Sequence, residues 1–132
     1  MRSQKHPSLD SQRATILVVD DDPAVLSSLG FLFEIEGFAV RLYPNGATLL
    51  KESAIPTVGC LVVDQRLPDI SGLELIGALR ARQVAIPAIL ITTSPTPAVL
   101  AEAARSSISV IEKPLLTGAL YEQVRRALSP SS

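Results

Sequence analysis

Cysteine is almost absent from this chain of 132 residues. The one cysteine, Cys60, lies within an apolar run, which excludes a disulfide framework and indicates a reducing compartment. Its position favours a small buried hydrophobe over a reactive thiol. Because 47% of the residues are hydrophobic, the chain can instead build a packed core.

Long apolar runs and an excess of one charge are also missing. No apolar stretch approaches the roughly 20 residues that a helix needs to span a bilayer. The formal net charge is −1, which gives the chain no general attraction for nucleic acids. The N-terminal stretch is polar and lacks the apolar segment of a signal peptide. We therefore expect a cytoplasmic protein that binds neither membranes nor nucleic acids directly.

The chain does contain a regular alternation of apolar runs and helical patterns, which is typical of an α/β fold with a parallel sheet. Continuous apolar runs, as expected for central strands covered on both faces, occur in Ile16–Val19, Cys60–Val63 and Ala88–Ile91. Two segments are more polar, and we expect them at the edges of the sheet: Phe38–Tyr43 and Ile108–Val110. The pattern predicts a flavodoxin-like, doubly wound sheet of five parallel strands in the order 2-1-3-4-5, with five helices.

Capping residues and apolar stripes indicate where the helices lie. Asp22 is a good N-cap, Pro23 suits the first helical position, and Gly37 ends the helix that follows. The other helices are expected over Asn45–Ser53, after Gly72, over Ala98–Arg105 and from Leu116 to Leu128. We assign one domain to residues 14–128, a mobile tail to residues 1–13, and a tail or linker stump to residues 129–132.

Four of the apolar runs end in residues that can do chemistry. The runs Ile16–Val19, Val58–Val63, Ala88–Ile91 and Ser107–Ile111 are followed by Asp20–Asp22, Asp64, Thr92 and Glu112–Pro114, respectively. In a parallel sheet these ends meet at one edge, where the ligands of open α/β sheets bind. A cluster of carboxylates, a hydroxyl group and an amine would then share one pocket.

The carboxylates in this group predict a metal site. Asp20, Asp21 and Asp64 would repel one another, so at least one should have a raised pKa unless a cation lies between them. Mg²⁺ or Mn²⁺ suits oxygen ligands, and the absence of histidine and cysteine near these strand ends argues against zinc or copper. Capping explains Asp22, and because aspartates are common in turns, a structural role for Asp20 and Asp21 also stays open at this point.

Lys113 and Thr92 favour a phosphoryl group at the same place. A lysine beside a carboxylate–metal cluster spreads the charge of a phosphoryl group, and a hydroxyl can donate to its oxygens. A carboxylate can itself be the nucleophile and form an aspartyl phosphate. Asp64 is the best candidate because it stands alone, with a loop opening after it, which leaves Asp20 and Asp21 for the metal.

Four motifs in this order resemble the receiver domain of bacterial two-component response regulators: Val18–Pro23, Asp64–Gly72, Thr92 and Lys113-Pro114. The resemblance covers about Thr15 to Leu128. It implies that Asp64 accepts a phosphoryl group from a histidine kinase or a phosphotransfer protein. Such a domain catalyses at most its own phosphorylation and dephosphorylation.

The resemblance also implies roles for the other residues. Asp20, Asp21, Asp64 and the backbone carbonyl of Arg66 would hold Mg²⁺, while Thr92 and Lys113 would bind the phosphoryl oxygens. The Lys113-Pro114 peptide is expected to be cis. A surface of the fourth helix, fifth strand and fifth helix would bind an output partner or a second copy.

Several positions depart from the pattern of that family. Val110 stands where an aromatic ring is usual in the fifth strand, Ser106 where glycine is common, and Thr93 where alanine or glycine is favoured. The segment Ser94–Pro97 is shorter and stiffer than the usual loop, because proline fixes φ. We therefore expect a site that can be phosphorylated together with an altered output surface.

Three other functions stay open at this stage. A receiver-like adaptor, used mainly as a protein-binding module with atypical or absent switching by phosphorylation, fits Val110 and the proline-containing loop, although the complete pocket weighs against it. A Mg²⁺-dependent phosphohydrolase could use the same aspartate, but the chain has no room for a cap over its substrate. A flavin-binding protein is disfavoured because flavin phosphate needs hydroxyl and amide donors after the first strand rather than three aspartates.

Overall fold

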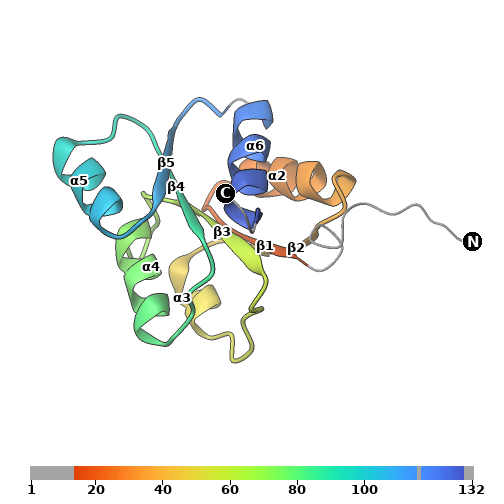
Figure 1. The fold of residues 1–132 in the computed structure, drawn as a ribbon, viewed down its shortest axis with the longest axis horizontal. Coiled ribbons are helices and arrows are strands. Elements are labelled where there is room, and N and C mark those ends of the chain that lie inside the picture. The colour runs from red at the N-terminus through yellow and green to blue at the C-terminus, as the bar shows by residue number, and fades with distance from the viewer. Residues whose placement is uncertain (1–13, 116, 130–132) are drawn as a thin grey trace, which may run out of the picture.

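The computed structural model describes residues 14–115 and 117–129, so the predicted N-terminal tail, Leu116 and the last three residues lie outside the described part. Strands and helices alternate along the chain, as predicted (Figure 1). In chain order the elements are β1 (Thr15–Val19), α2 (Pro23–Ile35), β2 (Ala39–Tyr43), α3 (Gly46–Leu50), β3 (Gly59–Asp64), α4 (Gly72–Ala81), β4 (Ala88–Thr92), α5 (Pro97–Arg105), β5 (Ser109–Glu112) and α6 (Thr117–Leu128).

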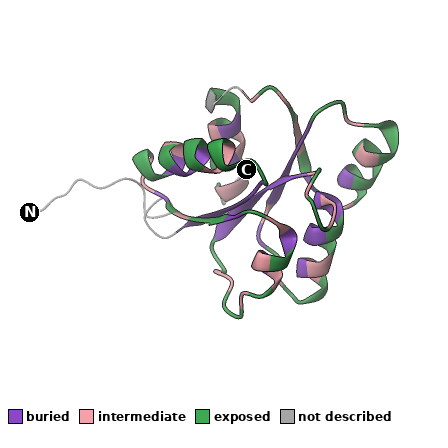
Figure 2. Cartoon of the chain, turned by 180° about the vertical axis from the view of Figure 1, so that it is seen from behind, coloured by how far each residue is buried: buried purple, intermediate pink, exposed green. Residues whose placement is uncertain are grey.

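The strands form one parallel sheet in the order β2-β1-β3-β4-β5, which confirms the predicted topology. Every residue of β1, β3 and β4 is buried, whereas most residues of β2 and β5 are at least partly exposed. Figure 2 shows these buried central strands between helices whose outer faces are exposed. The difference between apolar and mixed strands in the sequence thus identified the centre and the edges of the sheet.

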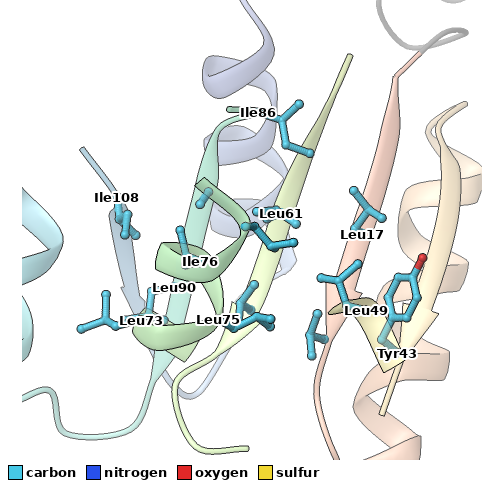
Figure 3. Packing of buried hydrophobic residues seen from close by; sticks show 14 of the residues in the cluster. Leu17, Tyr43, Leu49, Leu61, Leu73, Leu75, Ile76, Ile86, Leu90 and Ile108 are labelled. Atoms are coloured by element: carbon cyan, nitrogen blue, oxygen red, sulfur yellow. The ribbon is translucent and has the colours of Figure 1, made fainter. Parts of the chain in front are cut away.

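Alternate side chains of the strands supply two cores, one on each face of the sheet. On one face, strand residues such as Leu17, Leu61 and Leu90 pack against α3, α4 and α5. The close-up in Figure 3 shows the part of this core that lies against α3 and α4. On the other face, strand residues such as Ile16 and Val62 pack against α2 and α6. Because helices cover both faces of the sheet, the parts of the central strands left open to a ligand are their N-terminal and C-terminal ends.

Cys60 lies in the second of these cores and is fully buried. Burial raises the pKa of its thiol to about 12, so the thiolate form is suppressed. The cysteine is therefore a packing residue, as predicted. No helix within the described residues is long and apolar enough to cross a membrane.

The predicted boundaries hold at α2 but shift elsewhere. The Asp22 carboxylate accepts from the Ala24 N–H, and Gly37 follows the helix with a φ of 97°. The predicted helix over Asn45–Ser53 is shorter, since Asn45 lies outside α3 as its N-cap. β5 begins two residues later than the predicted run Ser107–Ile111. Ser107 has a φ of 57°, which is incompatible with extended backbone at this residue.

Two glycines offer a contrast that tests this packing. A Cβ at Gly59 of β3 would collide with the carbonyl oxygen of Thr15 in β1, whereas a Cβ at Gly77 of α4 would meet nothing within 4 Å. We predict that Gly59→Ala lowers the free energy of unfolding by about 3 kcal/mol. Gly77→Ala should raise it by about 0.5–1 kcal/mol, because alanine favours the helix and restricts the unfolded chain. Urea unfolding followed by circular dichroism measures both, and a Gly59→Ala variant of wild-type stability would contradict the close strand contact.

Candidate functional site

A polar pocket of about 300 Å³ opens at the carboxyl ends of the central strands. It contains all six residues predicted from the sequence, together with three neighbours: Asp20, Asp21, Asp22, Asp64, Gln65, Arg66, Thr92, Thr93 and Lys113. The parallel register explains this convergence, since Val19 of β1 pairs with Val63 of β3 and Thr92 of β4 pairs with Glu112 of β5. The residues at or just after the carboxyl end of each of these strands therefore lie close together.

Asp20 is the most deeply buried member of the acidic group, with 2% of its surface exposed. Its Oδ1 accepts a hydrogen bond from the Asp22 N–H at 2.9 Å, whereas its buried Oδ2 has no hydrogen-bond partner among the described residues. Burial raises the pKa of Asp20 to about 6, and the nearby charge of Asp64 contributes in the same direction. A raised pKa in this group was predicted from repulsion, but loss of hydration contributes more.

Asp64 ends β3 and is held from two sides. Its Oδ1 accepts from the Arg66 N–H at 3.2 Å, and its Oδ2 lies 3.2 Å from the Lys113 ammonium nitrogen. Lys113 follows β5, its backbone N–H donates to the Thr92 carbonyl at 2.8 Å, and its peptide bond to Pro114 is cis, as the resemblance implied. The same ammonium lies 4.0 Å from Oδ2 of Asp20, so one cation is shared by two buried carboxylates.

The acidic group fits a metal ion. Asp20, Asp21 and Asp64 each offer a carboxylate oxygen, and these three oxygens lie within 4.8 Å of one another. Oδ2 of Asp20 is buried and accepts no hydrogen bond from the described residues, so a bound cation would supply the partner that a buried carboxylate oxygen requires. An all-oxygen set favours a hard cation such as Mg²⁺ or Mn²⁺. Asp22 is exposed and caps α2, in agreement with the role predicted for it.

Thr92 and Val110 lie where the sequence pattern placed them. Thr92 ends β4 with 8% of its surface exposed and lines the pocket beside the exposed Thr93. Val110 is half-buried in β5 and packs against the core under α3, α4 and α5. An aliphatic side chain thus occupies this point of β5.

Two polar residues of the loop after Asp64, Gln65 and Asp69, were not among the predicted site residues. Gln65 lines the pocket, and its side-chain oxygen accepts from the Leu73 N–H at 2.9 Å. The Asp69 carboxylate accepts from two N–H groups of α3. Their position between Asp64 and Ser71, the N-cap of α4, was the one indication in the sequence that they belong to the site. Their hydrogen-bond partners are backbone groups, which only the fold identifies.

A doubly wound sheet with an acidic pocket and a lysine at its switch point defines a class of α/β regulatory domain. A sequence model of the response regulator receiver domain matches residues 16–125. The chain therefore belongs to the response regulator receiver domain family, whose members are signalling domains.

Individual relatives agree with this assignment. The chain is 34% identical to the transcriptional regulatory protein FixJ of Rhizobium meliloti over 114 residues, which cover 86% of this chain and 56% of that protein. FixJ of Azorhizobium caulinodans is 37% identical over 116 residues, which cover 87% and 55% of the two chains. The chain thus spans about half the length of the curated relatives that it matches.

Solved structures share the fold. The crystal structure of FixJ-N superposes with a TM-score of 0.79 at 33% identity, covering 92% of this chain and 98% of that one. A CheY-like receiver domain from Methanospirillum hungatei JF-1 gives a TM-score of 0.79 at 26% identity, covering 87% and 93%. Sequence and structure therefore point to the same family.

The raised pKa of Asp20 makes the stability of the metal-free protein depend on pH. Between its ordinary value of 3.8 and about 6, the folded protein binds more protons at this carboxyl than the unfolded chain does. Stability from this group is therefore present at low pH and is lost as pH rises through 6. We predict that Asp20→Asn raises the free energy of unfolding by about 1–2 kcal/mol at about pH 7.5, and by much less at about pH 4.5.

Urea unfolding in the presence of a chelator measures this difference. Asp22→Asn is the matched control, because it removes a neighbouring exposed charge and asparagine is an equally good N-cap. An equal gain in the two variants, or a gain from Asp20→Asn that does not depend on pH, would contradict a buried carboxylate as the cause.

Proposed function

We propose that Asp64 accepts a phosphoryl group from a protein donor in a Mg²⁺-dependent reaction, and that the domain then switches an interaction surface. The carrying observation is the 3.2 Å contact between the Lys113 ammonium and Oδ2 of Asp64, at the edge of an acidic group suited to a cation. Positive charge on both sides of one carboxylate is what an anionic phosphoryl group needs in order to approach it. An adaptor that acts only by binding proteins would have no use for this arrangement.

In the proposed reaction, a carboxylate oxygen of Asp64 attacks the phosphorus of the donor's phosphohistidine. An O–P bond forms, the N–P bond breaks, and the bonding electrons return to the imidazole nitrogen, which is then reprotonated. Lys113 compensates charge on the transferred group, and the Thr92 hydroxyl donates to one of its oxygens. Water later attacks the same phosphorus, the bond between the Asp64 oxygen and phosphorus breaks, and inorganic phosphate leaves, which restores the carboxylate. The domain thus undergoes one phosphorylation and one dephosphorylation per cycle rather than turning over a free substrate.

The proposed metal ligands are Asp20, Asp21, Asp64 and the backbone carbonyl of Arg66. When bound, Mg²⁺ supplies charge compensation for the phosphoryl oxygens. The chain's own contribution is to hold the oxygen ligands together against their repulsion, which the buried sheet edge does for Asp20 and Asp64. Arg66 lines the pocket and donates its N–H to Asp64, which places it beside the group it is proposed to assist.

The proposed donor is a histidine kinase or a histidine phosphotransfer protein, and the acting unit is residues 14–128 in the cytoplasm. The proposed output surface comprises α5, β5 and α6, which bind a partner protein or a second copy rather than nucleic acid. In α5, which the structure describes in full, Ala103 is the one buried residue, and Leu100 is 45% exposed. A side chain of α4, Arg80, donates to the Ser106 carbonyl at the end of α5.

Phosphorylation of the purified chain tests the acceptor directly. Incubation with Mg²⁺ and acetyl phosphate should add the mass of one phosphoryl group to the intact protein, and Asp64→Asn should add none. Lys113→Ala should slow the reaction by about 100-fold, because it removes charge compensation at the transferred group. A labelled wild-type protein whose Asp64→Asn variant is labelled equally would overturn the choice of acceptor, and no labelling of the wild type would favour the adaptor.

Removal of the metal tests the second half of the proposal. A chelator in excess should abolish labelling by acetyl phosphate, and Mg²⁺ or Mn²⁺ should restore it, since either cation suits the three carboxylates. Asp21→Asn should raise the Mg²⁺ concentration needed for half-maximal labelling by about tenfold. Labelling that proceeds at the same rate in the chelator would contradict the metal site.

A further inference from the structure

The loop of residues 65–71 connects the proposed acceptor to α4 and contains the proposed carbonyl ligand. Its base is closed by hydrogen bonds around Gln65. The Gly72 N–H donates to the Gln65 carbonyl at 3.0 Å, and the Leu73 N–H donates to the Gln65 side chain at 2.9 Å. The Arg66 N–H donates to Asp64 at 3.2 Å. Hydrogen bonds thus hold the backbone at the start of the loop, on the N-terminal side of Arg66.

The far side of the same loop is attached to a different helix. Oδ1 of Asp69 accepts from the Gly46 N–H at 3.1 Å, and Oδ2 accepts from the Ala47 N–H at 2.8 Å. Both N–H groups belong to the first turn of α3, which precedes β3 in the chain. One exposed carboxylate therefore holds the loop to a helix that packs on the same face of the sheet as α4.

A packing contact supports this attachment. Gly46 is buried, and a Cβ at this position would collide with a methyl group of Ile70. Ile70 packs in turn against the core under α3 and α4. The residues at positions 69 and 70 therefore both lie against the start of α3, which fixes the part of the loop that follows Arg66.

The N-cap residue of α3 leaves two N–H groups of this helix to Asp69. The side chain of Asn45 accepts from the Thr48 N–H at 2.9 Å, so the Gly46 and Ala47 N–H groups are capped from the loop by Asp69, which thereby joins the loop to α3. The start of α4 has its own capping box, made by Ser71 and Glu74. Asp69 does not line the acidic pocket, so direct contact with a bound cation is not its role.

We propose that Asp69 is a positioning residue for the cation: by attaching the loop to α3, it holds the backbone carbonyl of Arg66 in place for the metal. This inference rests on the proposed function. A loop fixed at both ends loses little conformational freedom when its carbonyl binds a cation, whereas a loop released at Asp69 must be ordered during binding. Groups that hold metal ligands in place typically affect affinity by about tenfold or more.

The test measures Mg²⁺ affinity in the absence of any phosphoryl donor, from amide chemical shifts of the full chain during a Mg²⁺ titration. Asp69→Ala should raise the Kd for Mg²⁺ by about tenfold. Asp69→Asn keeps an acceptor oxygen without the charge, so its Kd should lie closer to that of the wild type. Asn45→Ala is the matched control because it removes the other cap of α3 and leaves the loop attached, and its Kd should stay within about twofold of the wild-type value.

Each outcome decides the proposal. A wild-type Kd in Asp69→Ala would overturn it while leaving the proposed function intact. An equal loss in Asn45→Ala would assign the effect to the stability of α3 and would overturn positioning. Failure of the wild-type chain to bind Mg²⁺ would instead overturn the proposed function.

A second variant guards against loss of folding in Asp69→Ala. Gly46→Ala leaves the Asp69 carboxylate in place but pushes Ile70, and with it the loop, away from α3. It should raise the Kd for Mg²⁺ in the same direction. If Asp69→Ala does not fold, a wild-type Kd in a folded Gly46→Ala variant overturns the proposal.

Discussion

Repulsion between carboxylates that cannot move apart is the constraint on which this structure depends. Asp20 and Asp64 follow adjacent strands in register, so the hydrogen bonds of the sheet fix their separation. Lys113 lies near both of them, but one ammonium group cannot neutralise three neighbouring carboxylates. Burial is the main cause of the raised pKa of Asp20, and the charge of Asp64 raises that pKa further. A cation, and then an anion that binds to it, are the chemical species that this excess of negative charge selects.

The rest of the fold makes this arrangement tolerable. Three central strands with every residue buried, covered by helices on both faces, resist the distortion that would let the carboxylates separate. The site lowers stability locally, and the large apolar cores offset that loss elsewhere. Functional sites commonly depart from the most stable arrangement in this way.

The order of the strands and five of the six predicted site residues could be derived from the sequence because both depend on simple patterns, whereas Arg66 was implied only by the resemblance to receiver domains. Unbroken apolar runs identified the strands at the centre, and parallel strands must bring their following residues to one edge. The bounds of α3 and β5 could not be derived in the same way, since they depend on the local backbone at Asn45 and Ser107. Asp69 was missed for a different reason: its partners lie 22 and 23 residues away and are backbone N–H groups, which no side-chain pattern reveals.

The sparse anchoring of α5 has a consequence for how such domains diversify. Its outer positions are small or exposed, so substitutions there change little of the buried core and cost little stability. The pocket residues, by contrast, lie at the ends of buried strands where few replacements are tolerated. Mutation can therefore alter which surface α5 presents while the pocket around Asp64 stays unchanged, so the proposed output surface can vary independently of the proposed phosphoryl acceptor.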